Sequence, residues 1–374
     1  MTTTSVKKNE TIVFQRSTDT SSTSSDDDLS EVKTQYDDKE KHTKVKPQVS
    51  TPSEVNAIDK YQMEISIIIL MSFALANCFE ITAPYVDKFI HLQNKYPGTD
   101  FYDIDINDAF FVFTWIFVAT FIRAFTMNYI LRPLASCVNI TSHKAIQRFM
   151  EQGWYLVYYS TSFIFGSYIY YHSPYFLNFD NFYIGWPHDK MTWLFKAYYL
   201  AELAGWLQQI FTLNIEERRK DHWQMFSHHI ITCFLVTGSY NYYFTRIGNV
   251  IMVIMDVVDI FLSTAKLLKY SGVQTFCDVM FGVFLISWVM LRHGLYNYMF
   301  YHAATSAKTL MVSGKCIEGL IQKTCWTDNI ITIFLSLLGG LQIIMCIWMY
   351  LIAKVAIKVV TGTGAEDVRS DDED

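Results

Sequence analysis

The sequence predicts an all-α protein, a polytopic membrane helical bundle of about eight transmembrane helices behind a polar N-terminal tail. Of its 374 residues, 51% are hydrophobic and 16% aromatic, whereas the first 60 residues are polar. Apolar stretches of spanning length follow the tail, and a helix needs about 20 apolar residues to cross a bilayer. These observations favour a membrane protein over a soluble globular enzyme.

The tail of residues 1–60 has too few large apolar residues to offset chain entropy, so we expect disorder there. The predicted spans are 65–86, 108–131, 153–171, 191–213, 226–244, 247–265, 275–299 and 329–357. The turn between the fifth and sixth spans is very short, so these two helices must be antiparallel neighbours.

Loop charge predicts the orientation of the spans. An even number of spans puts both termini on one side, where the loops carry the larger share of Lys and Arg near helix ends. The positive-inside rule therefore places both termini in the cytosol. The first span contains Asn77 and Glu80. If it does not cross the membrane, the N-terminus lies on the luminal side. No basic stripe interleaved with aromatic residues is present, so we expect no nucleic-acid binding.

Serines next to acidic runs predict phosphorylation in both tails. Ser24 and Ser25 run into three aspartates, and Ser370 precedes the acidic C-terminus. Each has an acidic residue three positions on, the pattern that acidophilic kinases prefer, and phosphate would add charge to an already acidic tail. An unmodified acidic tail is the alternative for each serine.

Two predicted helices carry polar groups that lipid would reject. His228 and His229 lie in the fifth span, with Thr232 one turn beyond His228, and Asp256 and Asp259 lie in the sixth. Ionisable residues in membrane helices usually face a protein interior or a water-filled cavity. All four titratable groups lie in the cytosolic half of their helices, so we expect them to surround one cavity there.

These residues resemble a known family. This set of residues resembles the Lag motif of TLC-domain ceramide synthases: His228-His229-x-x-Thr232, Gly248, Asp256-x-x-Asp259 and Lys266. The segments RFMEQGWYLVYY, FKAYYLAELAGWLQQ and RRKDHWQMFSHH extend the likeness over roughly residues 148–300 and resemble fungal members in particular. Many relatives carry a histidine just before the first aspartate. Here that position is Met255, so any role of that histidine is absent or replaced.

The resemblance implies transfer of a long or very long fatty acyl group from acyl-CoA to a sphingoid base, dihydrosphingosine or phytosphingosine, in the endoplasmic reticulum membrane. Acyl-CoA is then a substrate, and no cofactor is implied. The implied partners are a small single-span regulatory subunit and a homologous ceramide synthase subunit. We divide the chain into the cytosolic tail 1–60, two additional helices in 61–140, a TLC catalytic domain of six helices in 141–358 and an acidic cytosolic tail in 359–374.

His228, His229, Asp256 and Asp259 are the predicted catalytic groups. An alkyl amine has a pKa near ~10, so its attack on a thioester needs a group that removes a proton, and histidine is suited to this. An aspartate can fix the imidazole tautomer and stabilise the imidazolium. In a second route, one histidine takes the acyl group and passes it to the amine. The residue pattern leaves both routes open.

Further residues are predicted to bind substrate. They are Trp206, Gln209, Thr232, Arg292, Lys266, Arg218 and Arg219. A buried Arg292 could instead pair with an acid from another helix. The basic residues at the cytosolic rim could attract CoA phosphates, and ordinary positive-inside topology is the alternative.

Three other kinds of function are compatible with the sequence. One is a metal enzyme, but the ten histidines supply a single HH pair and no second box, so we expect no metal. A second is a non-enzymatic lipid-binding or translocon-associated protein of the TLC type. A third is that the four polar groups only join helices. Four titratable groups at one depth favour catalysis.

Cys316 and Cys325 lie in the loop of roughly 300–328, which loop charge places in the oxidising lumen. We predict a disulfide between them, which would constrain the entry to the last span. Two unpaired thiols are the alternative.

Overall fold

The computed structural model describes residues 57–215 and 221–361, which belong to one compact unit, Glu54–Asp374. Several sequence predictions lie outside the described residues. They are the phosphorylation sites Ser24, Ser25 and Ser370 and the rim residues Arg218 and Arg219.

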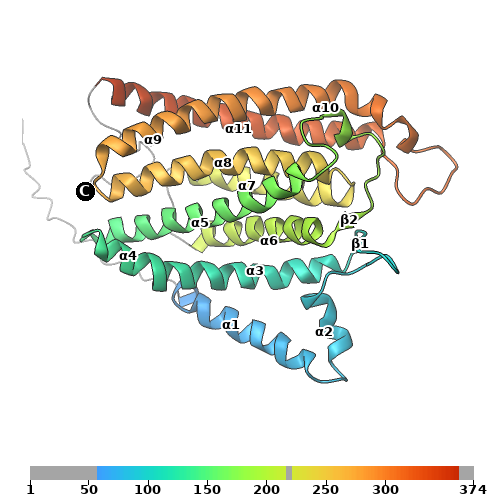
Figure 1. The fold of residues 1–374 in the computed structure, drawn as a ribbon, viewed down its shortest axis with the longest axis horizontal. Helices are drawn as coiled ribbons and strands as arrows, with labels where there is room; N and C mark the ends of the chain where they lie inside the picture. Colours follow the sequence, from blue (N-terminus) through green and yellow to red (C-terminus); the bar gives the residue numbers. More distant parts are fainter. Residues whose placement is uncertain (1–56, 216–220, 362–374) are drawn as a thin grey trace, which may run out of the picture. The chain divides into compact units, whose positions relative to one another are not determined.

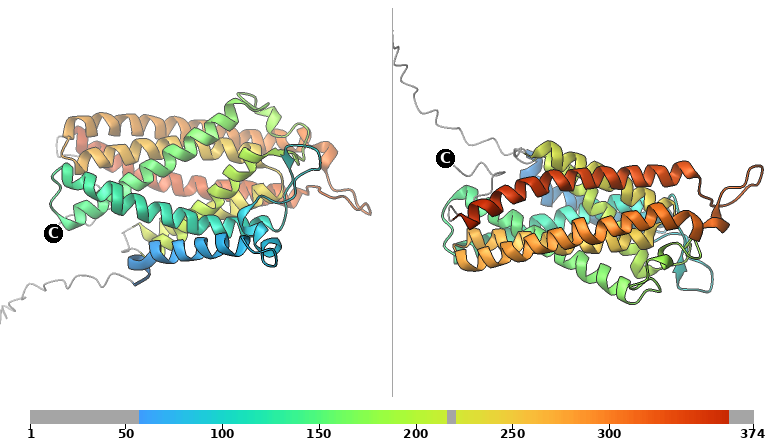
Figure 2. Two further views of the ribbon diagram at one scale, coloured as in Figure 1. Left: turned by 60° about the horizontal axis from the view of Figure 1, so that its bottom comes forward. Right: turned by 90° about the horizontal axis from the view of Figure 1, so that it is seen from above.

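Within the described chain, a long helical segment lies at each of the eight predicted spans, and these segments run side by side (Figures 1 and 2). They are α1 (Ala57–Asn77), α3 (Asp108–Phe125) continued by α4 (Arg132–Cys137), α5 (His143–Tyr171), α6 (Trp193–Ile215), α7 (His222–Asn241), α8 (Thr245–Tyr270), α9 (Gln274–Ser287) continued by α10 (Tyr296–Leu310), and α11 (Asp328–Val360).

The first predicted span, 65–86, has the wrong bounds. Helix α1 ends at Asn77, and a separate short helix, α2 (Ala83–Ile90), follows. Pro84 lies in the first turn of α2, where a missing N–H costs nothing because no helical acceptor is available to it. Glu80 is exposed in the turn between the two helices. The two polar residues that weakened this span in the sequence, Asn77 and Glu80, therefore lie at a break between two helices.

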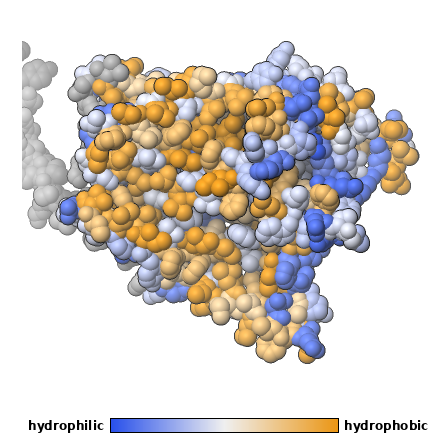
Figure 3. Space-filling model, viewed as in Figure 1, coloured by the Kyte–Doolittle hydropathy of each residue, from blue (hydrophilic) through white to orange (hydrophobic). Residues whose placement is uncertain are grey.

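Three helical segments in the described residues are long and apolar enough to cross a membrane: Asp108–Cys137, Gln274–Leu310 and Asp328–Val359. Hydrophobic side chains cover most of the face over the helices in Figure 3, and hydrophilic ones gather at the end that carries the strands and loops. Broad exposed apolar surfaces mark contact with a membrane or a partner. The predicted fold class, an all-α membrane helical protein, is confirmed.

Helices α6, α7 and α8 have protein neighbours on several sides. Helix α5 packs along α8, which also contacts α9, while α6 lies between α3 and α7, and α7 also contacts α11. One buried apolar cluster joins α8, α9, α10 and α11, and a second joins α3, α6 and α7. Polar residues of these helices can therefore face protein instead of lipid.

Within the described residues, two π-helical segments interrupt the regular helices. The first, Thr126–Leu131, ends just before Pro133, whose ring would clash with the carbonyl four residues earlier in an α-helix, so the wider turn accommodates it. The second, Trp288–Leu295, joins α9 to α10 and contains Arg292. Such segments often occur at functional sites.

The end of the bundle at the right of Figure 1 is closed by strands and loops. Strand β1 (Phe101–Tyr102) pairs antiparallel with β2 (Met191–Thr192). The loop between α10 and α11 contains a disulfide between Cys316 and Cys325, whose Cα atoms are 4.8 Å apart.

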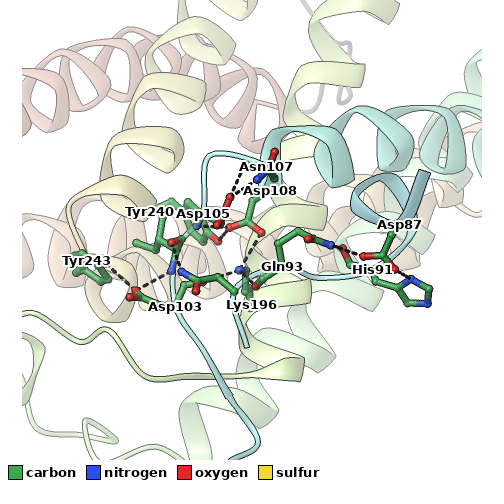
Figure 4. A network of polar contacts seen from close by, with 12 residues as sticks. Asp87, His91, Gln93, Asp103, Asp105, Asn107, Asp108, Lys196, Tyr240 and Tyr243 are labelled. Carbon is green, nitrogen blue, oxygen red and sulfur yellow. Dashed lines mark hydrogen bonds and ion pairs between the residues drawn. The ribbon is translucent and has the colours of Figure 1, made fainter. Parts of the chain in front are cut away.

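Beneath these strands lies a cluster of buried polar residues, shown in Figure 4 and here called the polar network: Asp103, Asp108, Lys196, Tyr240 and Tyr243. The ammonium of Lys196, which is fully buried, donates to the carbonyl oxygens of Gln93 at 2.8 Å and Asp103 at 2.6 Å and pairs with Asp108 at 2.9 Å.

Candidate active site

Two cavities meet beside the first turns of α7. The outer cavity has many polar lining groups, among them Arg148, Gln152, Gln209, His222, His229 and Lys266. The inner cavity is lined mainly by apolar side chains of α7, α8, α10 and α11. Four residues line both cavities: Trp206, His228, Asp259 and Arg292. These four residues define the junction.

His228 is held by packing. Its ring lies between the indoles of Trp206 and Trp348, with centroid distances of 5.6 and 5.2 Å. The hydroxyl of Thr232 donates to the His228 backbone carbonyl at 2.9 Å, which leaves the ring untouched. Nδ1 of His228 is buried and has no hydrogen-bond partner within the described chain. The imidazole is therefore oriented without being committed to a protein partner.

His229 is committed on both sides of its ring. Nδ1 lies 2.7 Å from the Met225 carbonyl oxygen, which can only accept, so Nδ1 carries the hydrogen. Nε2 then has the free lone pair, and the Gln209 side-chain amide lies 3.3 Å from it. The amide atom nearest to Nε2 is Oε1, so with a neutral His229 the Gln209 amide has to turn over to present its NH₂ group to Nε2. Gln209, predicted to bind substrate, thus contacts His229 in this structure.

Asp259 and Arg292 form an ion pair with a distance of 2.7 Å. The same guanidinium nitrogen of Arg292 donates to the carbonyl oxygen of Met255 at 3.1 Å, and the guanidinium lies 4.4 Å from the centroid of a Trp288 ring. The sequence left a choice for Arg292 between an ion pair and a substrate contact. The structure contains the ion pair and also places Arg292 at the junction of the cavities, so the two roles are compatible.

Asp256 does not reach the junction. The expectation that all four titratable groups surround one cavity is therefore wrong for Asp256. Asp256 is buried, lines neither cavity, and accepts a hydrogen bond from Ser162 of α5. Glu202, which accepts from Tyr158 at 3.1 Å, belongs to the same buried group. Residues three apart on a helix differ in direction by about 60°, enough to face different neighbours.

Gly248 of the motif, in α8, makes room for the side chain of Tyr199 from α6. A Cβ atom at this position would overlap the Tyr199 hydroxyl, which shares a hydrogen bond with Ser239 of α7. Tyr199, Ser239 and Gly248 all line the inner cavity. The glycine is thus needed for packing, because any side chain would displace Tyr199.

Sequence reasoning missed Trp348 and Tyr159. Both line the outer cavity, but they come from α11 and α5, and nothing in their spacing relates them to the histidines. Lys266 lines the outer cavity and Thr232 the inner one. In the part of the chain that the structure describes, no three His, Cys, Asp or Glu side chains are grouped as a metal site would require.

Comparisons with known proteins cover most of the chain. The family model of the TLC domain (TRAM, LAG1 and CLN8) matches residues 148–354. The sphingosine N-acyltransferase-like protein ALT7 of Alternaria alternata is 39% identical over 343 residues, covering 84% of this chain and 76% of the relative.

Two yeast relatives are similar over nearly as much of the chain. The sphingosine N-acyltransferase lag1 of Schizosaccharomyces pombe is 41% identical, covering 78% of this chain and 74% of the relative. The ceramide synthase LAG1 of Saccharomyces cerevisiae is 33% identical, covering 76% and 69%. The region of the family match contains both histidines, both aspartates and Arg292. The chain therefore belongs to the TLC domain family.

Proposed function

We propose that this protein is a ceramide synthase that transfers a long fatty acyl group from acyl-CoA to the amine of a sphingoid base. The observation that carries the proposal is the junction of a polar and an apolar cavity at His228. An acyl-CoA has the same division, with a charged nucleotide at one end and a hydrocarbon chain at the other. Its thioester would then lie beside the imidazole.

His228 is the group that we expect to act on the substrates. The amine loses protons as the amide forms, and a neutral imidazole can accept one. Alternatively, the same lone pair attacks the thioester carbon and His228 carries the acyl group to the amine. His229 has its donor and acceptor nitrogens occupied by Met225 and Gln209, so we assign it a positioning role. Asp259 holds the Arg292 guanidinium at the same junction through their ion pair, and we assign this aspartate a positioning role.

The outer cavity suits the CoA portion. Arg148 and Lys266 line it, and cations there would attract the phosphates of CoA. Asp256 is a structural group in this proposal, because it lines neither cavity and is bonded to Ser162. Arg218 and Arg219 stay predicted phosphate contacts.

We also propose that the protein lies in the endoplasmic reticulum membrane with both termini in the cytosol. The Cys316–Cys325 disulfide lies at the end of the bundle opposite the first turn of α7. An oxidising compartment at that end supports an outer cavity that faces the cytosol, where acyl-CoA is supplied. Phosphorylation at Ser24, Ser25 and Ser370, and association with a small single-span subunit or a homologous synthase subunit, remain predictions.

The test is an assay of membranes that contain this chain, supplied with dihydrosphingosine or phytosphingosine and a panel of acyl-CoAs of different length. We expect ceramide and free CoA in equal amounts. The assay is run with and without a single-span subunit, and with Schizosaccharomyces pombe lag1 as the positive control. No N-acylated product in any combination, with the chain present at normal level, would contradict the proposal and leave a lipid-binding protein.

A further inference from the structure

Hydrogen-bond donors without partners gather around His228. Within the described residues, Nε1 of Trp206, Nε1 of Trp348 and Nε of Arg292 are all buried and unpaired. Leaving a donor buried and unpaired costs free energy, and most buried polar groups are therefore hydrogen-bonded. Three such donors beside one histidine require an explanation.

The location of Trp206 separates it from the other two. Its side chain is on α6, is 7% exposed, and lines both cavities. Its ring lies 5.6 Å from that of His228 and 5.4 Å from that of His229, centroid to centroid. Trp348 lines only the outer cavity, and the guanidinium of Arg292 is engaged with Asp259 and Met255. Trp206 is thus a neutral residue that lines both cavities and whose buried Nε1–H has no partner in the described chain.

We propose that Trp206 is a catalytic residue whose Nε1–H donates a hydrogen bond to the acyl carbonyl oxygen in the transition state of acyl transfer. The inference rests on the proposed function, which puts the thioester at the junction. The same reasoning applies whether the attacking lone pair belongs to the amine or to His228, because both routes pass through a tetrahedral carbon with a negatively charged oxygen.

The electron movements are the following. The nucleophile's lone pair forms a bond to the carbonyl carbon, and the π pair of the C=O bond moves onto oxygen, where the indole N–H stabilises it. When the oxyanion collapses, the C=O bond re-forms and the C–S bond breaks. Its electron pair leaves with sulfur, which takes up one of the protons that the amine loses and gives free CoA.

An unpaired donor in the free enzyme is what such a role needs. Trp offers a single N–H and no acceptor, so it cannot be satisfied by a donor group nearby. A donor aimed at charge that develops during the reaction is worth most in a site shielded from water, and it acts on the transition state more than on the bound substrate. The cost of leaving Nε1 unpaired is then offset during catalysis.

The test compares Trp206→Phe with Trp348→Phe, each of which removes an indole N–H next to His228 and keeps an aromatic ring. We expect Trp206→Phe to lower kcat about 100-fold or more, the scale for losing one oxyanion donor, with KM for acyl-CoA little changed. Trp348→Phe measures what the loss of an indole N–H next to His228 costs outside the inner cavity, and its loss of kcat should be clearly smaller. Trp193→Phe, at an exposed position of α6 that lines neither cavity, is the control that should keep its activity. Binding of an S-alkyl-CoA thioether, which has no carbonyl oxygen, should be unchanged in Trp206→Phe.

Three results would overturn the inference. The first is normal kcat in Trp206→Phe, and the second is an equal loss in both variants, which would indicate ring packing. The third is weaker thioether binding or a lower unfolding temperature in Trp206→Phe that accounts for its loss of activity. A wild-type protein without N-acyl transfer would overturn the proposed function, and the Trp206 role with it, so the two failures are distinguishable.

Discussion

The two ends of the α6–α7 pair hold buried polar residues of opposite character. In the polar network, the Lys196 ammonium has three oxygen partners, and the hydroxyls of Tyr240 and Tyr243 each donate to a carboxylate at 2.7 Å. At the His228 end, Trp206, His228 and Arg292 each keep a buried atom without a partner in the described chain. The charged groups of the polar network thus have partners, which is what a purely structural role requires.

This difference indicates how stability and chemistry are separated along one pair of helices. A buried charge is tolerated only when its partners are complete, because removing one leaves the other uncompensated. Unpaired groups are tolerated beside a cavity that a substrate will fill. The role of a polar residue in a membrane helix is thus inferred from its hydrogen-bond and ion-pair partners as well as from its presence. The following four experiments test this contrast, from the largest expected effect to the smallest.

Lys196→Met should destabilise the protein by roughly 3–5 kcal/mol, because it leaves the buried Asp108 without its cation. Thermal unfolding in detergent measures the change. Lys190→Met, at an exposed position just before β2, is the control and should have little effect. If Lys196→Met is as stable as wild type, the polar network does not have the structural role that we assign to it.

His228→Ala should reduce ceramide formation by at least about 100-fold, the scale for losing an acid–base group, while its unfolding temperature stays near that of wild type. His229→Ala should also be strongly impaired, because its ring contacts Gln209 and Trp206. The exposed His172 provides a control through His172→Ala. Activity per folded molecule in purified variants is the measurement, and full activity in both His228→Ala and His229→Ala would refute the site.

Ala303→Leu should shift acyl-CoA preference toward shorter chains. Ala303 is buried and lines the inner cavity, so a larger side chain there occupies space meant for hydrocarbon. Each methylene in an apolar pocket changes discrimination by about 10-fold or more. Competition between acyl-CoAs of two lengths measures the shift. The exposed neighbour Ala304 gives the matched control, and an equal shift in Ala304→Leu would contradict this reading.

Lys323→Met should have the smallest effect, about 1 kcal/mol or less at neutral pH, because the lysine side chain is 75% exposed. Burial acts to raise the pKa of Asp103, but hydrogen bonds from Lys323 and Tyr243 outweigh it and hold that pKa below its usual value. Asp103 therefore stabilises the fold above about pH 4 and loses this contribution as pH falls through its lowered native value.

Without Lys323, the acid loss of stability should begin at higher pH. Unfolding midpoints of wild type and Lys323→Met between neutral pH and about pH 3 measure this. Identical acid profiles would show that Lys323 adds nothing to the paired end.

The sequence predicted the helices well because apolar runs of spanning length report on lipid directly. It also predicted the His228 and Asp259 region, because ionisable residues are rare in membrane helices. It could not separate Asp256 from Asp259, since both lie within one apolar helix and only the positions of α5 and of the π-helical segment Trp288–Leu295 decide which partner each meets. The Lys196 network was missed because its acids come from the loop and helix start near 103–108, far away in sequence.

The π-helical segment Trp288–Leu295 sets the rotation of α10 relative to α9 about their common helix axis. An α-helix advances about 100° per residue, so one residue more or fewer in this segment rotates everything after it by that amount. Arg292, inside the segment, meets Asp259, while Ala303 and Ala307, about three and four turns later, line the inner cavity. The position of Arg292 and the side of α10 that lines the inner cavity are therefore coupled through this segment. A single inserted residue in a relative could change which side of α10 faces the acyl chain and leave α9 in place.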